Sequence, residues 1–380
     1  DQFWYYYYDI IKQANQIIAG LDNATGTIFE KESIKGQCLG LRAYAYYHLI
    51  NLFQQTYKGN ENKPGVPIYL TAQITGNPRG TVQNVYDRII ADLTAAETLL
   101  TGKTFTSKVA MSLQVVQGYR ARVALVMEDW TNAATYAAKA RIGSTLMTTT
   151  QYTATSAFSS IAGPECMWGS LIPASEATIY ASFYSHVDVS TGGYAALGTQ
   201  KKITKALYDL MPATDIRKSC FTLPTSTSTS NPAYNQIKMR VPTAGSWAAD
   251  YTYMRASEMY LIEAEALSRK ADDAGARTAL QTLVVARNAS YSAASLSGAA
   301  LLSEILLQRR IELWGEGFSM IDIKRLKTGL NRLTGAGNHG SPSLDPIVYT
   351  MADADPRFIL RLPKRELDNN TSMTPADQNP

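Results

Sequence analysis

The sequence is poor in the residues that build metal centres. Its three cysteines, Cys38, Cys166 and Cys220, are far apart and odd in number, so they give no support to a disulfide framework or a zinc site. None of the three histidines is paired with another ligand-type residue one helical turn away. We therefore expect no metal site.

Long uniform runs are also absent. No stretch of eighteen apolar residues occurs, so we expect no membrane-spanning helix. The net charge is only +4 and no run of five basic residues exists, which argues against a nucleic-acid partner. No phosphate-binding loop, nucleophile elbow or HExxH motif occurs, and we expect no cofactor. Because the chain opens at Asp1 rather than Met, any signal peptide or lipid-bearing cysteine is expected upstream.

The residues that are abundant indicate a soluble globular protein. Apolar residues make up 45% and charged residues 18% of the 380 positions, which is enough to bury a sizeable core. The 23 tyrosines are the compositional outlier. A tyrosine ring has a flat apolar face and a polar tip, which suits packing between helices and also contact with sugars or peptides.

Both ends of the chain show helical periodicity. In residues 1–20, apolar side chains recur every three or four positions up to Gly20. Small residues such as Ala43 and Ala121 would let paired helices approach closely, as in tetratricopeptide repeats. Helices are predicted at 1–20, 31–54, 82–101, 108–127, 129–143, 201–211, 253–270, 272–288, 299–314 and 319–329.

The middle of the chain has a different texture. Residues 144–250 are rich in Ser, Thr, Gly and Pro, with scattered aromatics and short strand-like pieces such as CMWGSLI. We predict a mainly α fold in which tetratricopeptide-like helix pairs form a right-handed scaffold with a loop-rich insertion containing a few short strands. Residues 1–143 and 251–380 would pack as one domain, with 144–250 as a variable ligand-binding segment.

Several sequence blocks, taken together, resemble the SusD/RagB family. They are YDIIKQANQII and KGQCLGLRAYAYYHLINLF near the N-terminus, then RASEMYLIEAEALSR, LLQRRIELWGEGFSMIDIKRLKTGLNR, the pair NH at 338–339, and LPKREL before a closing QNP. Ser319-Met320 departs from the aromatic-rich pair that often precedes the aspartate, here Asp322.

The resemblance implies a non-catalytic lipoprotein on the outer face of the bacterial outer membrane. Such a protein would bind a nutrient glycan, or sometimes a peptide, and deliver it to a SusC-like TonB-dependent transporter. Membrane attachment would come only through an N-terminal lipid anchor that is not part of this chain. The ligand itself is not indicated.

Aromatic and amide side chains in the variable segment are the candidate ligand contacts. Rings can stack on the apolar faces of sugars, and amides can bind their hydroxyls. For each aromatic, packing into the local core of the segment is an equally good interpretation. The candidates are Trp168, Tyr180, Tyr184, Tyr194, Tyr234, Asn235 and Trp247, together with Tyr57 in the loop after the second helix.

Two C-terminal helices carry charges of both signs beside core-facing apolar residues. A partly buried arginine needs an anionic partner, so the two helices could satisfy each other in a structural clasp. We hypothesise that Glu258 or Glu265 pairs with Arg309 or Arg310, with Arg255 in the same group. Catalytic carboxylates and plain solvated charges are the alternatives.

Two other functions compete with nutrient capture. A tetratricopeptide adaptor would bind peptides or proteins through its inner helices, but these look aromatic and alanine-rich, which favours self-packing. A glycoside hydrolase would need two carboxylates facing one cleft about 5–10 Å apart. The acidic pairs in the sequence are better interpreted as loop and helix-start charges.

Overall fold

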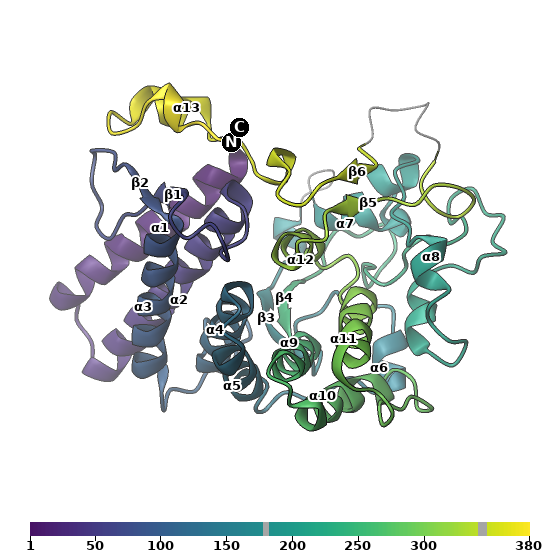
Figure 1. Ribbon diagram of the computed structural model, residues 1–380. Helices are drawn as coiled ribbons and strands as arrows, with labels where there is room; N and C mark the ends of the chain where they lie inside the picture. The colour runs from purple at the N-terminus through teal and green to yellow at the C-terminus, as the bar shows by residue number, and fades with distance from the viewer. Residues whose placement is uncertain (178–181, 341–347) are drawn as a thin grey trace.

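Helix pairs build the N-terminal part of the molecule. The computed structural model describes residues 1–177, 182–340 and 348–380. In Figure 1 the first helices, purple to blue, stand together on one side of the molecule. They are α1 (Gln2–Gly20), α2 (Ile28–Phe53), α3 (Val82–Leu100), α4 (Leu113–Met127) and α5 (Trp130–Ala140). Each corresponds to a helix predicted from the sequence.

The starts of these helices are fixed by local capping. Thr27 accepts a hydrogen bond from the backbone N–H of Glu30, and the Glu30 carboxylate accepts one from the backbone N–H of Thr27. Thr81 and Asn84 repeat the arrangement at α3. Such a capping box satisfies backbone donors that the first helical turn leaves free, so it sets where the helix begins.

Small residues let neighbouring helices approach closely. A side-chain carbon added at Gly40 would lie 2.6 Å from Cγ of Met111, and one added at Gly118 would lie 2.3 Å from the sulfur of Met254. Both distances are shorter than van der Waals contact. Each of these glycines is therefore needed for its packing contact, whatever its backbone conformation.

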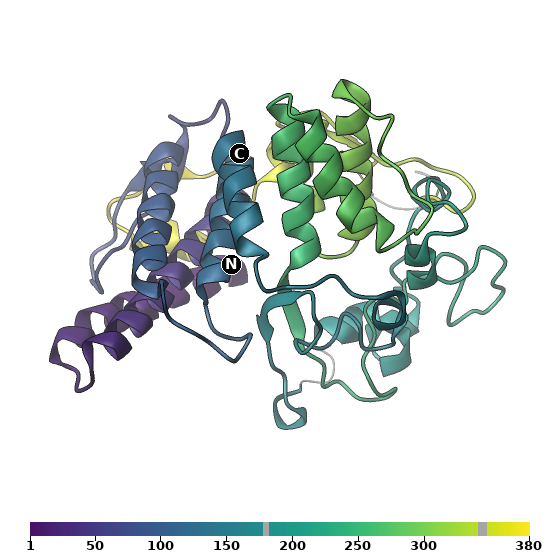
Figure 2. The same ribbon diagram turned by 90° about the horizontal axis from the view of Figure 1, so that it is seen from below.

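The two chain ends share one hydrophobic core. Helices α9 (Ala256–Arg269), α10 (Asp273–Val285), α11 (Gly298–Glu312) and α12 (Ser319–Leu326) form the C-terminal group. Figures 1 and 2 both place α9 beside α4 and α5. Met259 and Ile262 of α9 lie in the same buried cluster as Leu49 and Tyr119. Residues 1–143 and the C-terminal helices are thus packed against each other directly.

Two short strands join the middle segment to this core. Strand β3 (Cys166–Ser170), predicted from the sequence, pairs antiparallel with β4 (Tyr251–Arg255). The periodicity of the sequence predicts a helix from residue 253. In the structure β4 is extended as far as Arg255, and α9 begins at Ala256. The extended backbone makes side chains alternate between the two faces of the strand.

The middle segment packs on the helical scaffold. It contains short helices α6 (Thr149–Thr153), α7 (Phe183–Val187) and α8 (Lys205–Tyr208). Its buried Tyr152, Ile203 and Phe221 form a cluster with Ile311 of α11. In Figure 1 α6 and α8 of this segment lie on the far side of α11 from the N-terminal helices. The segment therefore shares its core with the scaffold.

The C-terminal tail returns to the N-terminal helices. Helix α13 (Lys364–Asn369), yellow in Figure 1, lies over them. The indole N–H of Trp4 donates to Glu366 at 3.3 Å, and the Asn379 side chain donates to the Phe53 carbonyl at 2.7 Å. None of the helices in the described part of the chain combines the length and apolar character needed to cross a bilayer.

Candidate ligand-binding cleft

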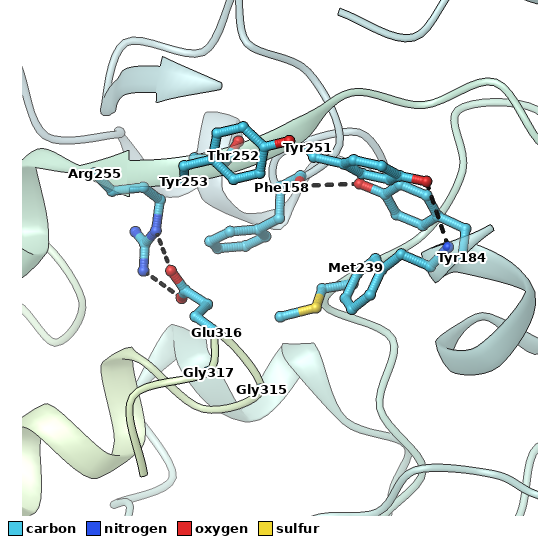
Figure 3. A pocket seen from close by; sticks show the side chains of 11 residues that line it. Phe158, Tyr184, Met239, Tyr251, Thr252, Tyr253, Arg255, Gly315, Glu316 and Gly317 are labelled. Atoms are coloured by element: carbon cyan, nitrogen blue, oxygen red, sulfur yellow. Dashed lines mark hydrogen bonds and ion pairs between the residues drawn. The ribbon is translucent and has the colours of Figure 1, made fainter. Parts of the chain in front are cut away.

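An aromatic-lined cleft of about 320 Å³ lies between the scaffold and the middle segment. Its size is that of a small-molecule or oligosaccharide subsite. The scaffold contributes β4 and the corner after α11, while the middle segment contributes α7 and two loops. The lining residues are Phe158, Phe183, Tyr184, Met239, Tyr251, Thr252, Tyr253, Arg255, Gly315, Glu316 and Gly317 (Figure 3).

Strand β4 supplies one wall of the cleft. Tyr251, Thr252, Tyr253 and Arg255 all border the cleft. The pairing of β3 with β4 shifts register between Met254 and Thr252, so the side chains around Tyr253 do not alternate strictly between two faces. Tyr253 is 37% exposed, and Phe183, which also lines the cleft, is 41% exposed. Large rings with this much exposure are available to stack on a ligand.

Tyr184 and Tyr251 form a fixed aromatic corner at one end of the cleft. Their rings stack with centroids 5.8 Å apart and planes 25° apart. The Tyr184 hydroxyl donates to the Asp250 carbonyl at 2.8 Å, and burial raises the pKa of this hydroxyl well above its usual range. Tyr184 is thus held rigidly, which preorganises the wall for binding.

An ion pair forms the opposite end of the cleft. Arg255 donates to both carboxylate oxygens of Glu316, at 2.9 and 2.6 Å, as Figure 3 shows. Lys238 donates to the same carboxylate at 2.6 Å. Burial opposes the charge on Glu316, but Arg255 and Lys238 outweigh it and hold the pKa of Glu316 below its ordinary value.

A larger buried network lies behind this pair. Arg255 also donates to Glu165 at 2.7 Å and to the Glu312 side chain at 3.2 Å. Arg287 bonds the same two carboxylates. Burial alone would raise the pKa of Glu312, yet the surrounding arginines, Arg287 foremost, lower it well below its usual range. The network ties the middle segment, through Glu165, to α11 and β4.

The glutamates of α9 do form buried ion pairs, but the expected pairing of Glu258 or Glu265 with Arg309 or Arg310 is wrong. Glu258 and Glu265 lie about 10 Å apart along α9, because seven residues make two helical turns. The two glutamates therefore contact different elements, and neither meets α11. Glu258 binds Arg122 of α4, at 2.6 and 2.8 Å, and Glu265 binds Arg325 of α12, at 2.6 and 2.8 Å.

The two adjacent arginines of α11 behave differently from each other. Arg309 is buried and donates to Asp322 of α12 at 2.8 Å. Arg310 points to solvent and makes no ion pair within the described ranges 1–177, 182–340 and 348–380. Successive helical residues lie 100° apart around the axis, so Arg310 is turned away from the side on which Arg309 meets α12. The prediction that Arg310 belongs to a buried clasp is therefore wrong.

Among the predicted aromatic contacts that fall in the described residues, Tyr184 alone lies in the wall of this cleft. Trp168 is 5% exposed and packs edge-on against Tyr44 and Tyr119 in the main core, with its indole N–H donating to Val109. Tyr57 is likewise buried, with its hydroxyl donating to Gln83 at 2.5 Å. Both rings serve the core of the scaffold.

The other candidates lie elsewhere in the middle segment. Tyr194 is exposed, and its ring stacks on that of His186 in α7 with centroids 4.8 Å apart. Trp247 lies beside Gly193, close to α7. Tyr234 packs edge-on against Tyr208. Asn235 is fully buried and donates to Asn231 and to the Gln236 carbonyl. Tyr180 falls outside the described residues.

Sequence reasoning missed most of the cleft. Phe158, Phe183 and Met239 carry no local signal, because they meet β4 only in the folded chain. One signal was present in the sequence: the alternation of Tyr251, Tyr253 and Arg255 is typical of a strand with one face of large side chains.

A second hollow of about 210 Å³ adjoins the cleft. Tyr253 borders both, and the second hollow is also lined by Tyr6, Ile10, Tyr44 and Trp168. Tyr6 is 56% exposed. Aromatic rings therefore line both hollows.

The lining chemistry is that of a binding site. Among the described lining residues Glu316 is the one carboxylate, whereas acid–base cleavage of a glycoside uses two. Flat rings around a polar end, on a scaffold of helix pairs, define the class of the molecule as a helical ligand-binding protein.

The chain belongs to the SusD family. The SusD family model matches residues 190–380, half of the chain, and a SusD-like model described as starch-binding and associating with the outer membrane matches residues 1–125. The family comprises non-catalytic carbohydrate-binding proteins. No curated protein matches the chain.

Solved structures agree over the whole chain. A SusD-like carbohydrate-binding protein from Bacteroides vulgatus is 26% identical, with a TM-score of 0.83, covering 100% of this chain and 84% of its own. A putative sugar-binding protein from the same organism is 25% identical, with a TM-score of 0.82 and the same coverage. A SusD superfamily protein from Bacteroides thetaiotaomicron is 22% identical, with a TM-score of 0.83, covering 99% of this chain and 85% of its own.

Proposed function

We propose that this protein captures a nutrient glycan at the outer membrane surface and passes it to a TonB-dependent transporter of the SusC type. The observation that carries the proposal is the open aromatic cleft between β4 and the middle segment, with the exposed rings of Tyr253 and Phe183 in its lining. Family membership and the carbohydrate-binding relatives from Bacteroides vulgatus support the glycan as the ligand class.

The site is suited to sugars because it combines two kinds of contact. The C–H faces of a pyranose ring pack on Tyr251, Tyr253 and Phe183, and the ring hydroxyls reach the carboxylate of Glu316. The adjoining hollow beside Tyr6 extends the surface for further sugar units. An oligosaccharide or polysaccharide is therefore the ligand that we propose.

Affinity electrophoresis and calorimetry test the ligand class. The purified protein is run through gels containing single polysaccharides, among them starch, laminarin, xyloglucan and galactomannan, and is titrated with matched oligosaccharides. A peptide mixture is titrated in parallel. Retardation by at least one glycan, with no heat from peptides, is expected. Binding of peptides alone would favour a tetratricopeptide adaptor and overturn the proposal.

Delivery to a transporter has its own test. An affinity-tagged copy is expressed in the native bacterium and purified from detergent-solubilised outer membranes. We expect a TonB-dependent transporter to co-purify in near-equal amount. Recovery of the tagged protein without a transporter under mild detergent would contradict the delivery step while leaving glycan binding intact.

A further inference from the structure

The cation in the cleft has no hydrogen-bond donor left for a ligand. A guanidinium carries five N–H groups, and Arg255 makes five hydrogen bonds inside the protein. Its Nε and Nη2 donate to Glu316 at 2.9 and 2.6 Å. Its Nη1 donates to Glu165 and to the Glu312 side chain at 2.7 and 3.2 Å, and Nη2 also reaches the Glu312 carbonyl at 3.3 Å.

The second cation at this end is saturated as well. An ammonium group has three N–H donors, and Lys238 uses all three. It donates to the Glu312 carbonyl at 2.7 Å, to the Trp314 carbonyl at 3.1 Å and to Glu316 at 2.6 Å. Its side chain is 2% exposed. Neither cation is therefore free to bind an incoming anion.

The anion at this end, in contrast, keeps a vacant acceptor position. A carboxylate offers about four lone-pair positions. From the described residues 1–177, 182–340 and 348–380 Glu316 accepts three hydrogen bonds, two from Arg255 and one from Lys238. Its side chain is 16% exposed toward the cleft. Of the described lining residues only Arg255 and Glu316 carry charge. Among the described lining residues, the accessible charged group is thus an ionised acceptor that a hydroxyl can approach.

We propose that the cleft selects uncharged glycans and rejects those carrying uronate or sulfate groups. This inference rests on the proposed glycan-binding function and specifies its ligand class. An anionic sugar at this end would be desolvated beside the Glu316 carboxylate without a free cation to pair with, which is unfavourable. A neutral sugar keeps its hydrogen bonding there, because its hydroxyl donates to the free acceptor position of Glu316 instead of to water.

Paired polysaccharides test the selectivity in the unmodified protein. Gels and titrations compare neutral glycans (laminarin, xyloglucan, galactomannan and starch) with alginate, polygalacturonate and a sulfated galactan at equal ionic strength. We expect binding only among the neutral set, with affinity for the anionic set at least about tenfold weaker. Equal or stronger binding of an anionic polymer overturns the inference and leaves glycan binding standing. Binding of neither set overturns the proposed function and this inference with it.

Two variants test the cause of the selectivity. Glu316→Gln removes the negative charge and leaves Arg255 and Lys238 in excess. Thr252→Lys adds a cation to the cleft wall without removing a residue of the buried ion-pair network, and serves if the first variant folds poorly. Each is expected to raise affinity for uronate polymers about tenfold, and 0.5 M salt should abolish the gain. Asp22→Asn, an exposed loss of charge after α1, is the control.

A correctly folded Thr252→Lys protein that still shows no affinity for uronate polymers would overturn the charge-based account. The same conclusion follows if Asp22→Asn raises uronate binding as much as Glu316→Gln, since net charge rather than the cleft would then be responsible.

Discussion

Arg325 donates to both carboxylate oxygens of Glu265, at 2.6 and 2.8 Å, and so holds α12 against α9. Both side chains are almost wholly buried. Arg122 with Glu258 and Arg42 with Asp92 are buried in the same bidentate way. Each pair joins two helices that are distant in sequence. The scaffold is therefore fastened by charge-assisted hydrogen bonds in addition to its apolar core.

Removing one partner of such a pair should be costly. Arg325→Ala leaves the Glu265 carboxylate buried without its bidentate partner, and we expect a loss of about 3–5 kcal/mol in the free energy of unfolding. Arg310→Ala, which removes an exposed arginine from α11, should change it by less than about 0.5 kcal/mol. Urea unfolding followed by circular dichroism measures both. Similar midpoints for the two variants would show that the buried pair contributes little.

Aromatic residues of the core and of the cleft should respond differently to mutation. Trp168→Ala empties a tightly packed site and should lower the free energy of unfolding by about 3–5 kcal/mol. Phe183→Ala removes a ring that is 41% exposed and should cost about 1 kcal/mol or less. The melting temperatures of the two variants measure this difference. Unchanged melting of the Trp168 variant would mean that its ring is not part of the core.

Close helix packing gives a prediction for two glycines. Gly118→Ala places a carbon against the sulfur of Met254, so we expect a loss of about 1–3 kcal/mol. Gly20→Ala at the end of α1 meets nothing within 4 Å and has right-handed helical dihedral angles, so it should be neutral or stabilising by about 0.5–1 kcal/mol. Chemical unfolding of the pair checks the sign of each effect. A neutral Gly118→Ala would argue against the tight contact with β4.

His48 should make stability depend on pH. It is surrounded by the rings of Tyr7, Tyr44, Tyr47 and Tyr119, and this burial, aided by Arg122, lowers its pKa from 6.5 to about 3. Between these values the unfolded chain binds a proton that the folded chain excludes. The contribution is therefore fully present above pH 6.5 and is lost as the pH falls, by roughly 1.4 kcal/mol per pH unit.

The histidine contribution is isolated by comparing two proteins. His48→Phe keeps a ring in place and removes the titration, so its unfolding free energy should fall less steeply than that of the wild type between pH 6.5 and pH 5. Contributions from the rest of the chain are common to both proteins and cancel. Parallel stability curves over this range would contradict the prediction.

The helical scaffold was predictable because its determinants are local. Apolar periodicity ending at Gly20 and the capping residues Thr27 and Thr81 are encoded within a few positions of the helices that they define. Periodicity misplaced the start of α9, because Tyr251–Arg255 pairs with β3 and becomes extended. A strand partner about 85 residues away leaves no local trace.

The partners of the charged residues could not be predicted from the sequence, for a similar reason. Arg255 was expected in a clasp, but its partner Glu165 lies 90 positions earlier in a loop. Nor could composition distinguish Trp168, which packs in the core, from Phe183, which faces the cleft. Both are large rings in a loop-rich segment, and only the tertiary contacts decide which one is open to a ligand.

The central claim is that the rings of the cleft bind a glycan. The most direct measurement is calorimetric titration of the best-binding polysaccharide into the wild type and into Tyr253→Ala and Phe183→Ala, with Phe29→Ala as a control that removes a 57% exposed ring outside the cleft. Loss of a stacking ring should weaken binding about tenfold or more in each cleft variant, while Phe29→Ala binds as the wild type does. Full affinity in both correctly folded cleft variants would contradict the account.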